Sequence, residues 1–182
     1  MSRTRISRAF AALAGLVFMA AIAAPARGAD PSPDLWERLK AFHGDLCLGS
    51  VMGARIGLAA KAALLKAGGE GKLMAAYYDL SCPVDGIQVA VGTTYGGRTL
   101  TVEDRDDHRL VLTAEGNGKQ VEAKLTKLAD DKGAAFRVMK GKSRALPEGS
   151  KERQDIEKEM AVIVKWFQTA PDAEVVEVKI VH

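Results

Sequence analysis

The run from Gly49 to Lys66 is almost free of charge and rich in small residues. It contains three charged residues, Arg55, Lys61 and Lys66. Its glycines and alanines give one face a small-residue stripe, which includes Gly53, Gly57 and Ala60. A helix with such a stripe lets another backbone approach closely. We therefore predict a central, mostly buried helix that ends before Gly68-Gly69. Two internal charges and its length argue against a membrane span.

The other periodic segments alternate between helical and extended patterns. Helices are predicted at residues 35–42, 84–91 and 151–169, and strands at 73–80, 98–103, 109–114 and 175–181. Residues 121–128 fit either a strand or a helix, and 141–149 are predicted to form a loop. The strands at 98–103 and 109–114, joined by an acidic turn, are typical of a hairpin. Together these elements predict an α+β fold: a single core domain with a mainly antiparallel sheet and packed helices.

The first 28 residues have the layout of a secretory signal peptide. They carry four arginines and no acid, and Ala9 to Ala26 is apolar except for Gly15 and Pro25. A basic start, an apolar run and small residues before a break predict export and cleavage after Ala26 or Gly28. A retained membrane anchor is the alternative, since the run approaches spanning length. We expect a periplasmic or secreted domain at residues 29–182, with no membrane span once the signal is removed.

The net charge changes when the signal is set aside. The whole chain has 26 basic and 23 acidic residues, a formal charge of +3. Without the four arginines of residues 1–28, 22 basic residues face 23 acidic ones, and the net charge is −1. No basic block or basic patch with interleaved aromatic residues remains. Nucleic acid is therefore not an expected partner.

The chemistry of the chain concentrates around its only two cysteines, Cys47 and Cys82. His43 precedes Cys47 by four residues, so on one helical turn their side chains would leave the same face about 5–6 Å apart. Such a pair can bind a soft or borderline metal, with Cys82 as a third ligand. Asp45 would add an oxygen ligand if it lies in a turn. Asp85 would either add another or orient His43.

Two alternatives to a metal site remain open from the spacing alone. Two cysteines in an exported protein most often form one disulfide, because that compartment is oxidising. A free reactive thiol is the other alternative. His108, in the predicted hairpin turn, and His182, the last residue, add no ligand pattern. No C-x-x-C-H motif is present, which excludes covalent c-type haem.

Two stretches carry a resemblance to a known family. The run FHGDLCLGSVMGARIGLAA, at residues 42–60, resembles the opening motif F-H-G-H-x-C-P-G of the formylmethanofuran dehydrogenase FmdE family. SCPVDGIQVAVGTTYGGRTL, from residue 81, is similar to that family's second motif, C-x-x-D-A-I-Q followed by G-C-T-x-G-x-G-N-L. The resemblance implies an α+β core domain whose motif His and Cys residues line a metal-binding pocket, often with zinc. It also suggests a homodimer.

The sequence departs from the family pattern at three positions. Asp45 stands in place of a second His, Leu48 in place of Pro, and Thr93 in place of Cys. The four-Cys zinc module found at the C-terminus of some members is not encoded. Carried over by position, His43, Cys47 and Cys82 are the candidate ligands, with Asp45 and Asp85 as weaker ones. Three protein ligands would leave an open position, as catalytic sites do. Zinc is the expected metal, with copper, as Cu(I), or iron as alternatives.

Three functions follow as expectations. The first is an exported accessory protein or carrier for a metal or redox group, with a periplasmic redox protein or metalloprotein as its partner. The second is a small zinc-dependent enzyme in which Asp45 or Asp85 acts as base in metal-assisted hydrolysis. The third is a disulfide-stabilised binding domain without metal. The family's namesake complex uses a molybdenum or tungsten cofactor in the cytoplasm, and no motif here points to such a cofactor.

Overall fold

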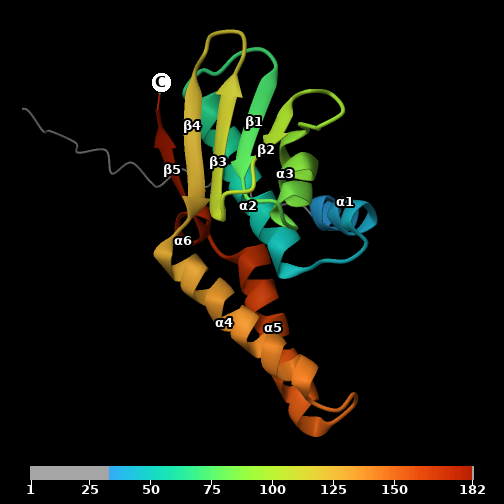
Figure 1. The fold of residues 1–182 in the computed structure, drawn as a ribbon. Helices are drawn as coiled ribbons and strands as arrows, with labels where there is room; N and C mark the ends of the chain where they lie inside the picture. Colours follow the sequence, from blue (N-terminus) through green and yellow to red (C-terminus); the bar gives the residue numbers. More distant parts are fainter. Residues whose placement is uncertain (1–32, 182) are drawn as a thin grey trace, which may run out of the picture.

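A computed structural model describes residues 33–181 of the chain (Figure 1). The helices in this part are α1 (Pro33–His43), α2 (Leu48–Lys66), α3 (Pro83–Val91), α4 (Lys127–Ala145), α5 (Lys151–Thr169) and α6 (Asp172–Val175). The strands are β1 (Leu73–Tyr78), β2 (Leu100–Val102), β3 (Asp107–Ala114), β4 (Gln120–Leu125) and β5 (Val176–Ile180). The predicted α+β fold is confirmed. The predicted signal peptide at residues 1–28 lies outside the described residues.

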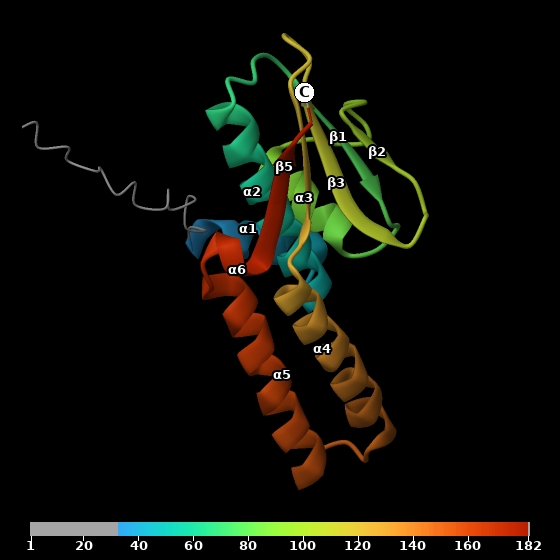
Figure 2. The same ribbon diagram turned by 90° about the vertical axis from the view of Figure 1, so that its left-hand side faces the viewer.

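The five strands form one sheet in the order β2-β1-β3-β4-β5. β1 pairs in parallel with β2, and the other three pairings are antiparallel, so the sheet is mainly antiparallel as expected. Along β3 and β4 buried and less buried residues alternate, with Leu110 opposite Ala123 and Leu112 opposite Val121 on the buried face. α2 packs along that face (Figures 1 and 2).

The predicted hairpin between residues 98–103 and 109–114 is wrong. β1 lies between the two segments, with Ala75 opposite Leu100 on one side and opposite Leu112 on the other. The acidic segment 104–106 passes the end of β1, where the Arg105 amide donates to the Tyr78 carbonyl. Alternating polarity indicates that a segment is a strand, but it does not say which strand becomes its neighbour. The hairpin forms instead between β3 and β4, around the turn Gly116-Asn117-Gly118.

α2 is the core helix that its small residues predict. By length and composition alone it would be able to cross a membrane, but 67% of its most apolar 18-residue stretch is buried inside the fold. α3 lies directly against it, backbone to backbone. A Cβ on Gly53 of α2 would overlap the Pro83 carbonyl oxygen, and one on Gly86 of α3 would overlap the Ser50 carbonyl oxygen. The close approach of the two helices therefore requires glycine at both positions.

α4 and α5 form a long helical hairpin that extends away from the sheet (Figures 1 and 2). The loop predicted at residues 141–149 is wrong at its start, because α4 continues to Ala145. A Cβ on Gly141 would meet nothing within 4 Å, so no packing constraint acts on this glycine. One exposed glycine costs a helix only about 1 kcal/mol, which the alanine- and lysine-rich neighbours offset. The ambiguous segment 121–128 divides between β4 and the first turn of α4.

A buried arginine ties the C-terminal elements to α2. The guanidinium of Arg55 donates to the carbonyl oxygens of Phe167 and Ala170, each at 2.6 Å, and to Asp172 Oδ1 at 2.8 Å. Arg55 is fully buried. Its three acceptors lie at the end of α5 and the start of α6, so this one side chain fixes where α5 meets the core.

Candidate metal centre

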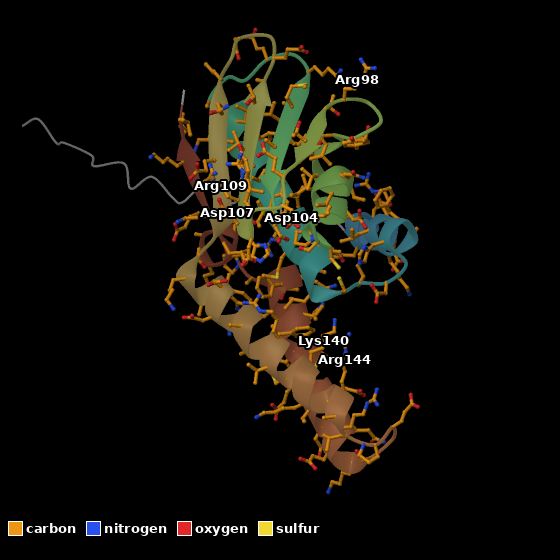
Figure 3. All side chains as sticks on the ribbon, viewed as in Figure 1. Arg98, Asp104, Asp107, Arg109, Lys140 and Arg144 are labelled. Carbon is orange, nitrogen blue, oxygen red and sulfur yellow. The ribbon has the colours of Figure 1, made fainter. Side chains whose placement is uncertain are left out.

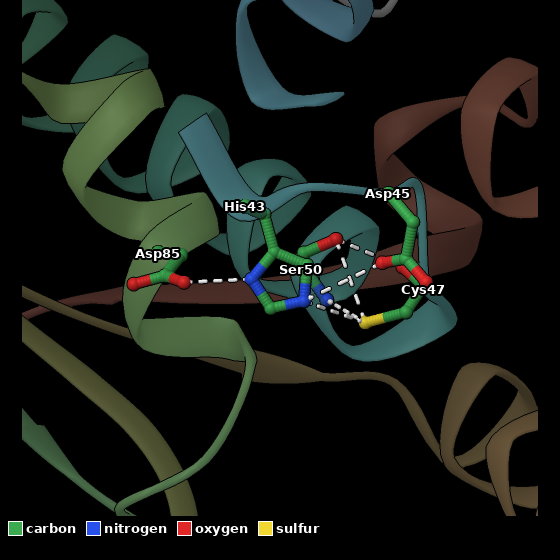
Figure 4. Close-up of polar contacts among 5 residues, drawn as sticks. All are labelled: His43, Asp45, Cys47, Ser50 and Asp85. Atoms are coloured by element: carbon green, nitrogen blue, oxygen red, sulfur yellow. Dashed lines mark hydrogen bonds and ion pairs between the residues drawn. The ribbon is translucent and has the colours of Figure 1, made fainter. Parts of the chain in front are cut away.

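His43 and Cys47 lie on either side of a sharp turn between two helices. His43 is the last residue of α1, and Cys47 is the N-cap of α2. Gly44 between them has a φ of +97°, which an L side chain rarely adopts. The two residues therefore do not share a helical turn, contrary to the expectation from their spacing. The turn nevertheless brings His43 Nε2 to 3.3 Å from Cys47 Sγ (Figure 4).

Cys82 reaches the same place from the start of α3. It directly precedes Pro83, the first residue of that helix. A Cβ on Gly49 would lie 2.9 Å from the Cys82 Cβ, so the glycine lets Cys82 approach the first turn of α2. The donor atoms of His43, Cys47 and Cys82 all lie within 4.8 Å of one another. Both cysteines are free thiols in the structure.

Asp85 contacts the other nitrogen of His43. Its Oδ2 lies 2.6 Å from His43 Nδ1 (Figure 4). In the neutral imidazole this contact makes Nδ1 the protonated nitrogen, which donates to the carboxylate and leaves the Nε2 lone pair facing Cys47. Of the two roles considered for Asp85, the geometry matches the one in which it orients His43.

Hydrogen bonds shift the pKa values of the first two donors in opposite directions. The hydrogen bond to Asp85 raises the pKa of His43, although partial burial acts against it. Burial raises the pKa of the Cys47 thiol, but the hydrogen bonds from the Ser50 backbone N–H and hydroxyl, the contact with Cys82 and the charge of His43 together lower it by more, so the net shift is downward. The Ser50 amide donates to Cys47 Sγ at 3.4 Å, at the positive end of α2. In the metal-free protein, both shifts favour the charged forms, an imidazolium and a thiolate, relative to the isolated side chains.

The second thiol behaves differently. Burial, and then its hydrogen bond with Cys47, raise the pKa of Cys82. Two neighbouring thiolates repel each other, so ionisation of Cys47 disfavours ionisation of Cys82. A cation placed between them would remove this penalty.

Asp45 lies at the edge of the site. Its side chain is 76% exposed, and its Oδ1 is 3.7 Å from His43 Nε2. It is not part of the three-donor group. The structure thus brings together three of the five predicted residues as donors, places Asp85 behind His43 and leaves Asp45 in solvent.

The donor set fits a soft or borderline metal ion. One imidazole nitrogen and two sulfurs suit zinc or Cu(I), and hard cations such as Mg²⁺ prefer oxygen. Cys82 is exposed and Cys47 is half-buried, so the group is reachable from outside. His43 would hold such an ion through Nε2, and the cysteines would hold it through their sulfurs.

A cavity of about 220 Å³ adjoins the two thiols. It lies between the first turns of α2, the segment before α3 and the middle of α4, and Cys47 and Cys82 line one end. His108 lines another part of it, with Nδ1 at 3.3 Å from the Tyr77 hydroxyl and 3.4 Å from Asp79 Oδ2. His108 is the second residue of β3 and does not sit in a hairpin turn.

Sequence reasoning missed three residues that line this cavity: His108, Arg137 and Lys140. His108 stands alone among polar residues, and the two cations lie on a helix that the pattern did not predict. No local signal connects any of them to Cys47 or Cys82. Only the tertiary fold, which places β3 and α4 beside the first turns of α2, brings them together.

The comparisons with known proteins identify a family and a similar fold. A family described as "FmdE, Molybdenum formylmethanofuran dehydrogenase operon" matches residues 42–177. A search of curated proteins finds no match. Among solved structures, a tungsten formylmethanofuran dehydrogenase FmdE-like protein from Syntrophus aciditrophicus is similar, with a TM-score of 0.54 and 21% sequence identity. The similarity covers 81% of this chain and 70% of that chain. At this identity the likeness concerns the fold.

Proposed function

Because the chain belongs to the FmdE family, we propose that it is an exported metal-binding domain, an accessory protein or carrier for a metal ion or redox group. The observation that carries this proposal is the group formed by His43, Cys47 and Cys82, whose donor atoms lie within 4.8 Å of one another. Zinc is the metal that this donor set favours, with Cu(I) or iron as alternatives.

The carrier role is supported by the accessibility of the donor group. A closed structural zinc site has four protein ligands and is shielded. Here three donors come together and Cys82 is exposed, so a ligand from another molecule can reach an ion held there. The partner on this proposal is a redox protein or metalloprotein of the periplasm. A homodimer is part of the proposal, and light scattering on the processed chain tests it.

Export belongs to the same proposal and rests on residues 1–28. Their four arginines and apolar run are the reason for placing the functional domain at residues 29–182, in the periplasm or outside the cell. Expression of the full chain in a bacterial host, followed by N-terminal sequencing of the periplasmic fraction, tests this. A new N-terminus after residue 26 or 28 is expected. An intact Met1 on membrane-bound protein would contradict export with cleavage.

Substitutions in the donor group test the metal proposal. We expect His43→Ala and Cys82→Ala each to abolish stoichiometric zinc binding, because two remaining donors hold zinc too weakly. His108→Gln is the matched control: it removes the other histidine near the cavity and is expected to retain one zinc per chain. Zinc content is measured by elemental mass spectrometry after dialysis. Retained zinc in His43→Ala would show that the ligand set is wrong.

The cavity beside the thiols favours a second candidate, a small zinc-dependent hydrolase. A bound zinc ion would supply Lewis acidity at its open position. Asp85 lies 2.6 Å from His43 Nδ1, whereas Asp45 is exposed and 3.7 Å from Nε2, so of the two proposed bases Asp45 is the one more available to accept a proton. The hydrolase requires turnover that chelation abolishes and zinc restores, and that Asp45→Asn reduces. Turnover unchanged by chelation would rule it out.

A further inference from the structure

We propose that the cavity beside Cys47 and Cys82 binds a small organic carboxylate with an apolar body about the size of benzoate. This names the ligand class of the site proposed above, and it rests on the proposed function only in sharing the two thiols. Shape, apolar lining and charge each support it.

The size of the cavity limits the body of the ligand. Its volume is about 220 Å³. An apolar cavity of about 150 Å³ in another protein is large enough to hold benzene. A single ring or a short branched chain therefore fits, and a nucleotide or a peptide does not.

The walls away from the thiols are apolar. Met52 and Ile56 line the cavity from α2, Leu125 from the end of β4 and Phe136 from α4. Gly133 of α4 also lines it and contributes no side chain; a Cβ there would lie 3.1 Å from the Met52 Cε. An apolar body placed here is removed from water on several sides, which favours binding through the hydrophobic effect.

Two cations mark the rim. Arg137 and Lys140 are three residues apart on α4, so they lie on the same face of the helix, and both line the cavity. In the view of Figure 3, Lys140 lies on α4 below the start of α2. Within residues 33–181 neither cation has an ion-pair partner.

No acidic residue of the described chain lines the cavity. The carboxylate of Asp79, behind the wall, already accepts a hydrogen bond from the Ser81 hydroxyl and lies beside His108. The unpaired positive charge on the rim is thus available to a ligand anion. An inorganic anion would leave the apolar walls uncovered, and a neutral apolar molecule would leave both cations unpaired.

Calorimetric titration of the zinc-loaded chain 29–182 with benzoate tests the proposal. Benzyl alcohol, which has the same ring without the charge, and acetate, which has the charge without the ring, are the comparison probes. We expect benzoate to bind at least tenfold more tightly than either probe. Only benzoate has both a ring that packs against the apolar walls and a carboxylate that pairs with the cations on the rim. Equal binding of the three, or no binding of benzoate up to its solubility, would overturn the proposal.

Variants on α4 locate the binding. Replacing both cations, Arg137→Gln with Lys140→Gln, is expected to weaken benzoate binding by about tenfold or more, since both charges that would pair with the carboxylate are removed. Lys142→Gln on the same helix, outside this cavity, should leave it unchanged. Gly133→Leu fills the apolar part and should abolish binding of benzoate. An equal loss in Lys142→Gln, or binding unaffected by the double substitution, would show that the anion does not sit on this rim.

The same variants separate this proposal from the metal proposal. None of them touches His43, Cys47 or Cys82, so zinc content should stay at one per chain in all of them. Benzoate binding to a chain that holds no zinc would leave the cavity proposal standing and contradict the metal proposal. One zinc per chain without benzoate binding would leave the metal proposal standing and contradict the cavity proposal.

Discussion

At His43 the imidazole is shared between a carboxylate and a thiol. Asp85 accepts from Nδ1 at 2.6 Å, and Nε2 faces Cys47 Sγ at 3.3 Å. A metal ion would be held by Nε2 and the Cys47 thiolate in place of the proton that the two groups share in the metal-free protein. The contact with Asp85 therefore prepares the histidine for metal before any metal arrives.

This arrangement predicts the effect of Asp85→Asn. Without the carboxylate, the pKa of His43 in the metal-free protein should fall, because its main source of elevation is removed. Zinc affinity should fall by about 10–100-fold, as for other partners that orient a ligating histidine. NMR titration of the imidazole and competition with a zinc chelator measure the two effects. Asp45→Asn, which replaces an exposed carboxylate, is the control and should change the pKa of His43 and the zinc affinity much less.

The raised pKa also sets the sign of a pH effect. A histidine whose pKa is higher in the folded than in the unfolded chain stabilises the fold most at a pH below the unfolded value. This contribution is lost as the pH rises through the folded value. The metal-free protein should therefore lose part of its free energy of unfolding as the pH rises above about 6.5. In Asp85→Asn, denaturant unfolding at several pH values should show a smaller loss. An equal loss in both proteins would contradict the assignment to His43.

The sequence predicts the donors of the site better than their setting. Cys47 and Cys82 are the only cysteines, so scarcity and the family motifs identify them. The spacing of His43 and Cys47 suggests one helical turn, but Gly44 breaks the helix and a turn produces the same proximity. His108 and Lys140 reach the cavity only through tertiary packing, and the short motifs contain no sign of them.

At the scale of elements, the contact between α2 and α3 positions the site. Cys47 is the N-cap of α2, Cys82 is the N-cap of α3 and Asp85 lies in the first turn of α3. The glycines between the two helices set how close they come. The small-residue stripe of α2 makes this contact predictable from sequence. The predictions of a hairpin at 98–103 and of a loop from residue 141 are wrong, because strand partners and exposed helical glycines depend on the rest of the fold.

Gly53→Ala tests the contact. Its Cβ would overlap the Pro83 carbonyl, a backbone atom that cannot rotate away, so α3 must shift from α2. We expect a loss of at least about 1–3 kcal/mol in the free energy of unfolding, together with weaker zinc binding. Gly141→Ala is the matched control in the open part of α4 and should be neutral or stabilise by up to about 1 kcal/mol. Urea denaturation measures both, and equal stability of the two variants would contradict the close packing.

At the scale of the whole molecule, Arg55 connects the core helix to the helical hairpin and thereby to the cavity wall formed by α4. Replacing it by methionine leaves the Asp172 carboxylate without its buried partner and two carbonyl groups without donors. We expect Arg55→Met to cost about 3–5 kcal/mol in the free energy of unfolding. Arg153→Met, at an exposed pair with Glu157 on α5, should change stability little. A similar small effect in both would show that the Arg55 contacts do not secure α5.

The charge of the whole molecule has a simple origin in this interpretation. The excess of basic residues belongs to residues 1–28, and the domain that follows is close to neutral. What distinguishes its surface is local: two unpaired cations on α4 beside two thiols. Composition does not reveal these two cations, because the net charge of −1 sums over charged groups that lie on different faces of the folded chain.

The most direct test of the metal proposal is the intact mass of residues 29–182, purified from an oxidising compartment and measured under native and denaturing conditions. The predicted result is one zinc ion per chain in the native spectrum and, after denaturation, the mass of the fully reduced chain with two free thiols. A native spectrum without metal, together with a denatured mass lower by two hydrogens, would show a Cys47–Cys82 disulfide. That result would contradict the metal site.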